Sequence, residues 1–250
     1  MINDKVIKYL SRIGAEGVTE VSVENLNILQ KAHLLSVPYE NYDIWSLKPT
    51  TLACDILFDK IVVRHRGGYC FELNGLFGWL LRELGYEVDE YFGRWLKDEP
   101  LQVPARRHRI LKVKVENREF IADVGVGQRT FLTPLEFIYD KVQNREGVDY
   151  RISKNERGES VVEMKSDDKW IAVYSFDSAP QAPIDFTYVH YFCANEPTSV
   201  FRSNLFVHLP TANGRNSIAT VQDPETGLMT QKLSILDGER SETRYLRTDS

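Results

Sequence analysis

The chain has 250 residues, a net charge of −5 and 42% hydrophobic residues, a composition typical of a globular protein with a sizeable core. The acidic balance disfavours nucleic acid as a partner. No apolar run reaches the roughly 20 residues that span a bilayer, and the N-terminus lacks the basic-then-apolar order of a signal peptide. Three scattered cysteines, Cys54, Cys70 and Cys193, indicate neither a disulfide framework nor a zinc site. We therefore expect a cytoplasmic protein without a metal or a membrane partner.

Helical periodicity dominates the first third of the chain. Asn3 or Asp4 is placed to cap a first helix, which Gly14 ends, and Ser22 is placed to cap a second one. A third predicted helix starts at Cys70, where leucine and phenylalanine residues begin to recur at helical spacing.

The pattern changes to strands for most of the remaining sequence. Alternating, aromatic-rich segments are separated by turn residues, which is typical of antiparallel strands. The predicted strands cover residues 86–97, 108–116, 119–124, 148–153, 160–164, 170–176, 205–209, 217–221 and 228–233. Helices followed by a long run of strands predict an α+β protein with segregated layers.

Cys70 is the first candidate for chemistry. Gly67 and Gly68 precede it and allow close approach of backbone or ligand. A helix N-terminus presents free N–H groups and the positive end of the dipole, which favour the nucleophilic thiolate. The competing interpretation is a small apolar residue in the core, which is what most free cysteines are. A base and an orienting carboxylate would favour catalysis.

His108 and Asp123 are the best candidates for that base and that carboxylate. His108 opens a predicted strand, and Asp123 interrupts the apolar end of the next strand, just before Gly125. A buried carboxylate needs partners, although backbone N–H groups at a bend would also suffice. The other histidines are less suitable: His33 is expected in the core as a satisfied structural residue, and His190 and His208 lack acidic partners at suggestive spacing. His65 is two residues from Gly67 and could reach the site, but it lies on the chain leading into it, where an exposed side chain is the alternative.

Two hairpin registers connect these strands. A turn at Asn117-Arg118, the first candidate, pairs Asp123 with Lys112, whereas a turn at Glu116-Asn117 pairs it with Ile110. Both put His108 and Asp123 on one face, but only the second makes them diagonal neighbours. If the contact forms, His108 takes the proton of Cys70 and Asp123 fixes the imidazole tautomer.

Several segments of this sequence resemble the arylamine N-acetyltransferases over residues 35–135. They are Pro38-Tyr39-Glu40-Asn41, Arg66-Gly67-Gly68-Tyr69-Cys70-Phe71-Glu72-Leu73-Asn74, the strand opened by His108, and Phe120-Ile121-Ala122-Asp123-Val124-Gly125-Val126-Gly127. The resemblance implies a cysteine-proteinase-like core in three parts. These are a helical bundle carrying the nucleophile (residues 1–85), a central antiparallel β-barrel carrying histidine and aspartate (residues 86–190), and a C-terminal α/β lid (residues 191–250).

The resemblance also implies a reaction. Acetyl-CoA, as co-substrate, would acetylate Cys70 of a Cys70–His108–Asp123 triad, and the thioester would pass acetyl to an arylamine, arylhydrazine or arylhydroxylamine in a ping-pong cycle. Arg66 and Glu40 match family positions that form a buried ion pair.

Further expectations concern the ligands. By the same resemblance, Phe201, Ser203 and Asn204 are expected to contact CoA, and Val126 and Phe71 to contact the acceptor. The position of Val126 is commonly aromatic in the family. The partners are thus CoA and a small aromatic amine or hydrazine, and the protein is a monomer or a homodimer. A transglutaminase-like or papain-like cysteine hydrolase remains the alternative, since it uses the same triad. A binding module and a metalloenzyme are less favoured, because all three triad residues are present and metal-ligand spacing is absent.

Overall fold

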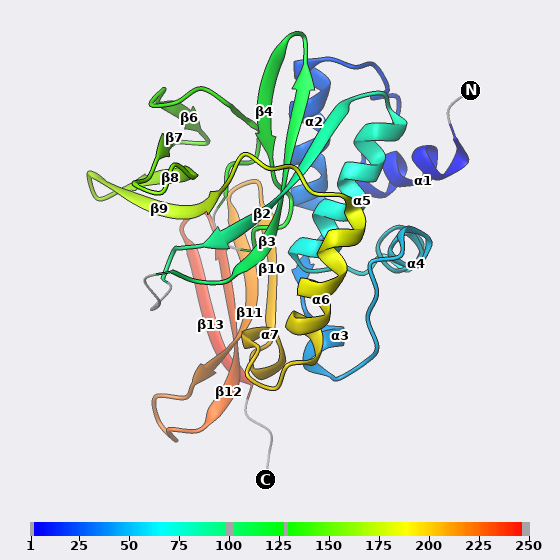
Figure 1. Cartoon of the computed structure of the whole chain (residues 1–250). Coiled ribbons are helices and arrows are strands. Elements are labelled where there is room, and N and C mark those ends of the chain that lie inside the picture. The colour runs from blue at the N-terminus through cyan, green and yellow to red at the C-terminus, as the bar shows by residue number, and fades with distance from the viewer. Residues whose placement is uncertain (1–2, 99–102, 128–129, 247–250) are drawn as a thin grey trace.

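The computed structural model describes residues 3–98, 103–127 and 130–246. Helices α1, α2, α4 and α5 gather on one side of the central strands, and β10–β13 belong to a second sheet (Figure 1). Within the described ranges, no helix has the length and apolar character needed to cross a membrane.

The three predicted N-terminal helices are confirmed. Their caps are those expected from sequence: the side chain of Asn3 accepts from the N–H of Lys5, and Ser22 accepts from the N–H of Asn25. Gly14 ends the first helix in the left-handed conformation. The helices are α1 (Asp4–Ile13), α2 (Val23–Ser36) and α5 (Cys70–Glu83); α3 (Tyr42–Trp45), α4 (Cys54–Phe58) and the π-helical turn η1 (Asp59–Val63) were not predicted.

His33 lies in the core, as expected, but it is not satisfied. Its ring packs against Tyr9 and Phe77 with centroid distances of 5.8 and 5.4 Å. Neither ring nitrogen finds a hydrogen-bond partner among the described residues. Burial, with a smaller contribution from the charge of Arg12, lowers the pKa of His33 to about 3.

The central sheet is a nearly closed antiparallel barrel, which confirms the predicted barrel. Its order is β5-β4-β3-β2-β9-β8-β7-β6. The Gln143 side chain joins the two ends, because its amide accepts from the N–H of Glu136 (2.9 Å) and donates to the same residue's carbonyl (2.8 Å). The strands are β2 (Glu87–Trp95), β3 (Arg106–Val115), β4 (Arg118–Ala122), β5 (Leu135–Glu136), β6 (Gln143–Arg145), β7 (Val148–Lys154), β8 (Ser160–Ser166) and β9 (Lys169–Phe176).

The β3–β4 hairpin adopts the second of the two registers considered. Val115 pairs with Arg118, so the turn is Glu116-Asn117 and not the other candidate, Asn117-Arg118. Both turn residues have positive φ, 53° and 57°, the backbone of a type I′ turn that matches the strand twist. This register makes His108 and Asp123 diagonal neighbours.

The C-terminal part combines two helices with a five-stranded antiparallel sheet of order β1-β10-β11-β12-β13. The short strand β1 comes from the N-terminal region, and the expected boundary between residues 190 and 191 falls inside α6. The α+β class with its three kinds of layer is confirmed, although α6 itself was not predicted. The elements are β1 (Tyr39–Glu40), the 3₁₀ turn η2 (Pro183–Asp185), α6 (Phe186–Asn195), α7 (Val200–Ser203), β10 (Phe206–Thr211), β11 (Gly214–Gln222), β12 (Met229–Asp237) and β13 (Arg240–Leu246).

Candidate active site

Cys70 is the first residue of α5, as predicted, and backbone packs tightly around it. A Cβ on Gly125 would lie 2.7 Å from the Cα of Cys70, and a Cβ on Gly67 would lie 2.0 Å from the carbonyl oxygen of Pro38. Glycine is therefore required at both positions by close approach rather than by backbone conformation. The Cys70 thiol lies 3.6 Å from the carbonyl oxygen of Arg107, the residue before His108.

The thiol is less acidic than its helix position suggests. Burial, with the negative charges around it, raises the pKa of Cys70 well above its usual value, and nearby backbone N–H groups offset only part of this shift. Burial therefore acts against the effect expected from the helix N-terminus. Burial disfavours the isolated thiolate, so a positive partner such as an imidazolium favours its formation.

His108 and Asp123 form the predicted contact. His108 Nε2 lies 2.6 Å from Asp123 Oδ2, and both side chains are buried. Trp95 and Tyr174 pack against the imidazole, with ring centroids 6.0 and 5.2 Å away. The ring is therefore held by a carboxylate at one nitrogen and by aromatic rings on its sides.

This contact selects one tautomer of His108. The Asp123 carboxylate accepts hydrogen bonds from the N–H of Gly125 and from the Asn74 amide, both at 2.8 Å, in addition to its contact with the imidazole. A carboxylate that accepts from all three favours the proton on Nε2, which leaves Nδ1 as the basic nitrogen. Nδ1 is then the atom available to a thiol.

Cys70 and His108 line one pocket of about 440 Å³. This volume is within the usual range for small-molecule sites. Aromatic and aliphatic side chains form much of the wall, among them Tyr39, Trp95 and Val126. A thiol and an imidazole therefore face a cavity that suits a small apolar ligand.

The predicted ligand contacts divide into two groups. Val126, expected at the acceptor, and Phe201, expected at CoA, both line this pocket. Phe71 does not: it is fully buried and packs against aromatic rings of β2 and α6. The Ser203 hydroxyl donates to the carbonyl of Ser199, and the Asn204 amide to that of Val200, so these side chains bond within and beside α7; neither residue lines the pocket.

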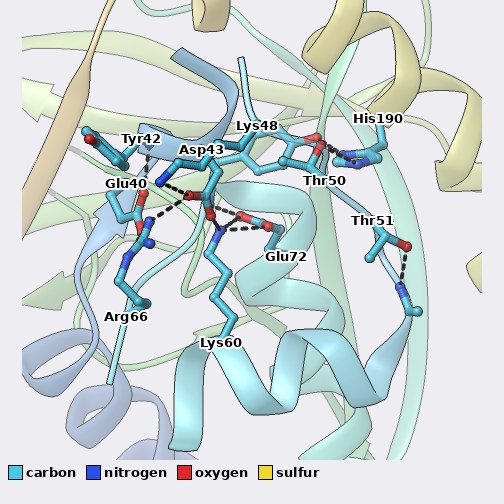
Figure 2. A network of polar contacts seen from close by, with 12 residues as sticks. Glu40, Tyr42, Asp43, Lys48, Thr50, Thr51, Lys60, Arg66, Glu72 and His190 are labelled. Carbon is cyan, nitrogen blue, oxygen red and sulfur yellow. Dashed lines mark hydrogen bonds and ion pairs between the residues drawn. The ribbon is translucent and has the colours of Figure 1, made fainter. Parts of the chain in front are cut away.

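The Arg66–Glu40 ion pair implied by the resemblance is present, but it is part of a larger cluster (Figure 2). Arg66 Nη2 lies 2.7 Å from Glu40 and 3.2 Å from Asp43. Lys60 Nζ lies 2.9 Å from both Asp43 and Glu72. Glu72 accepts the N–H of Tyr69 at 3.1 Å, so the cluster reaches the first turn of the helix that carries Cys70.

The sequence analysis missed three residues that support the site: Lys60, Glu72 and Asn74. Glu72 stands three residues after Tyr69, the spacing at which an acidic residue reaches back to a helix start. Asn74 stands four residues after Cys70, on the same helix face. Spacing was therefore a usable signal for these two, whereas nothing in the sequence indicates that Lys60 is buried.

The comparisons with known proteins agree on one family. A family model described as N-acetyltransferase matches residues 22–239. An arylamine N-acetyltransferase of Escherichia coli (strain K12) is 35% identical over 204 residues, which cover 81% of this chain and 72% of that protein. One from Mycolicibacterium smegmatis is 32% identical, covering 84% and 78%.

Solved structures show the same similarity. The arylamine N-acetyltransferase of Salmonella typhimurium superposes with a TM-score of 0.88 at 28% identity, covering 99% of this chain and 87% of that chain. The Mycobacterium marinum enzyme in complex with CoA superposes with a TM-score of 0.85 at 30% identity, covering 97% and 87%. The chain therefore belongs to the arylamine N-acetyltransferase family.

Proposed function

We propose that this protein transfers acetyl from acetyl-CoA to aromatic amines or hydrazines through a thioester on Cys70. The observation that carries the proposal is the buried His108–Asp123 pair, which faces the same pocket as Cys70 at the start of α5. The proposed place of action is a reducing cytoplasm, because a thiol nucleophile must stay reduced to carry acetyl.

In the first half-reaction, the Cys70 sulfur attacks the acetyl carbonyl of acetyl-CoA and its proton passes to Nδ1 of His108. The bond between the carbonyl carbon and the CoA sulfur breaks, and His108 returns the proton to the leaving thiolate. Asp123 stabilises the imidazolium during this step. Because burial disfavours an isolated thiolate at Cys70, the positive imidazolium is needed.

In the second half-reaction, the acceptor nitrogen attacks the thioester carbonyl. His108 accepts a proton from the nitrogen and gives it to the sulfur of Cys70, which restores the free enzyme. The aromatic pocket wall favours a flat acceptor, since rings gain by stacking and edge contacts. Val126 is a small side chain at this wall and leaves room for substituents on the acceptor ring.

A second pocket, of about 510 Å³, supports CoA as the donor. It shares Gly127 and His208 with the first pocket and contains Arg145 and Arg215. The pantetheine arm of CoA is long and thin, and its nucleotide end carries phosphates. We propose that the acetyl end lies at Cys70 and the phosphates lie near Arg215, for which no ion pair is found among the described residues.

The test is intact mass spectrometry of the protein mixed with acetyl-CoA in the absence of an acceptor. We expect one added acetyl group, which peptide mapping locates on Cys70 and not on Cys54 or Cys193. An aminobenzoate should then remove the label much faster than water does. Cys70→Ser should abolish labelling, whereas Cys54→Ser, a change at an exposed cysteine, is the matched control and should label normally.

The outcomes separate the proposal from the hydrolase alternative. A thioester that water removes as fast as it forms would indicate a cysteine hydrolase that uses the same three residues. No label on Cys70, in a protein with the native fold, would refute the thioester mechanism.

A further inference from the structure

Asn74 has no role in the reaction steps described above, although it lies close to the residues that carry them out. It is fully buried, and it lies one helical turn after Cys70 on the same face of α5. Burying an amide is costly unless its hydrogen bonds are made. The partners of Asn74 are therefore informative.

The Asn74 amide is satisfied on both sides, and its partners fix its orientation. Nδ2 donates to the carbonyl oxygen of Arg109 (2.6 Å) and to Oδ1 of Asp123 (2.8 Å), while Oδ1 accepts the N–H of Val124 (2.9 Å). Rotating the amide by 180° would place its oxygen against two acceptors. The donor is thus aimed at the carboxylate that holds His108.

A second buried amide, Gln30 of α2, contacts the same segment in a different way. It accepts the backbone N–H of Asp123 at 3.0 Å and donates to the carbonyl of Phe131 at 3.0 Å. Gln30 therefore anchors the backbone and does not contact the carboxylate. Comparing substitutions of the two amides therefore distinguishes support of the backbone at Asp123 from an effect on the Asp123 carboxylate.

We propose that Asn74 is a positioning residue for acyl transfer, whose amide turns the Asp123 carboxylate toward His108. Because Asn74 and Cys70 lie on one helix face, α5 both carries the nucleophile and orients the carboxylate behind the base. The inference rests on the proposed function in that Cys70 is the nucleophile. It goes further by assigning the geometry of the His108–Asp123 pair to a residue of the same helix.

The experiment measures alkylation of Cys70 by iodoacetamide as a function of pH, which needs no acetyl-CoA. The thiolate sulfur displaces iodide, so the rate reports the thiolate–imidazolium pair. Peptide mapping follows Cys70 and the exposed Cys54 in the same sample, and Cys54 supplies an internal reference rate. The variants are Asn74→Ala, Asn74→Asp and, as the matched control, Gln30→Leu.

We expect Asn74→Ala to slow alkylation of Cys70, relative to Cys54, by about 10- to 100-fold near neutral pH, the usual effect of losing a hydrogen bond to a charged group. Asn74→Asp keeps the shape but replaces the donor with a like charge beside Asp123. Two such carboxyls share a proton at mildly acidic pH, and the protonated one can donate again. The rate of this variant relative to the wild type should therefore recover as pH falls from about 7.5 to about 5.5.

Gln30→Leu should lower the melting temperature and change the Cys70 rate by a factor that is independent of pH. If Asn74→Asp also gives a pH-independent ratio, or alkylates like the wild type, Asn74 has no positioning role. This near-isosteric variant decides the question even if Asn74→Ala fails to fold. A wild-type protein that alkylates as described but is never acetylated by acetyl-CoA would refute the proposed function and leave this inference standing.

Discussion

Removing the positive charge of Lys60 should destabilise the fold strongly. The Lys60 side chain is 7% exposed and bridges Asp43, 16% exposed, and Glu72, 3% exposed. Burial alone would lower the pKa of Lys60, but the charges of Glu72 and Glu40 raise it above its usual value, so the ammonium is the stable form. In Lys60→Met, Asp43 keeps Arg66 as a partner, whereas Glu72 keeps, among the described residues, only the N–H of Tyr69.

The expected cost is that of leaving one buried charge unpaired, about 3–5 kcal/mol. For a chain of this size, roughly 2–4 °C of melting temperature is lost per kcal/mol, so the loss should be roughly 6–20 °C. Burial already raises the pKa of Glu72, against the effect of Lys60, and removing the lysine raises it further. A raised carboxyl pKa favours the folded state at low pH and disfavours it as pH rises, so the loss should be larger near pH 8 than near pH 5.5.

Thermal unfolding followed by circular dichroism at both pH values is the assay. The double variant Lys60→Met/Glu72→Gln is the control, because it removes both charges and keeps an acceptor for Tyr69; it should be more stable than Lys60→Met alone. A loss below about 2 °C near pH 8, or the same loss at both pH values, would refute the reasoning that Glu72 is the unpaired charge.

Three further predictions concern other parts of the molecule. Gly125→Ala should cost about 1–3 kcal/mol and reduce acetylation of Cys70, because the new Cβ would lie 2.7 Å from the Cα of Cys70; normal stability and labelling would contradict this. His33→Leu should reduce the loss of stability on acidification. Because the pKa of His33 in the folded protein is about 3, its neutral ring contributes stability above about pH 6.5, and this contribution falls by about 1.4 kcal/mol for each pH unit below that value. Urea titrations between about pH 6 and pH 4 measure how steeply the free energy of unfolding changes with pH. Arg215→Ala should raise the KM for acetyl-CoA several-fold but leave that for an acetylated pantetheine unchanged; an equal effect on both donors would exclude a phosphate contact.

Much of the fold followed from local rules. Asn3 and Ser22 cap their helices because a short polar side chain just before an apolar helical repeat can accept a hydrogen bond from a free N–H group of the first turn. The shared face of His108 and Asp123 was predictable because side chains alternate along a strand, whichever of the two hairpin registers is formed. Which of the two registers forms was not predictable, because both turns fit the same alternation of side chains and tertiary packing decides between them.

Other features depend on contacts that are distant in sequence. The α6 segment is rich in aromatic and β-branched residues, which are weak helix formers, and it is a helix that packs Phe186 against Phe71 and Phe92. Phe71 was expected at the acceptor and is instead covered by this helix. Lys60 looks like a surface residue in the sequence, but it is buried where it contacts both Asp43 of α3 and Glu72 of α5.

The contacts of Tyr39 join parts of the site that are synthesised at different times. In β1 it pairs with His208 of β10, it bridges to Gly68 two residues before Cys70, and Gly127 packs against its ring. A growing chain on the ribosome has therefore completed Cys70 long before β10 emerges to build the opposite wall. Until β10 pairs with β1, the Cys70 thiol lies at an incomplete cavity and is more exposed to oxidants than it is in the folded protein.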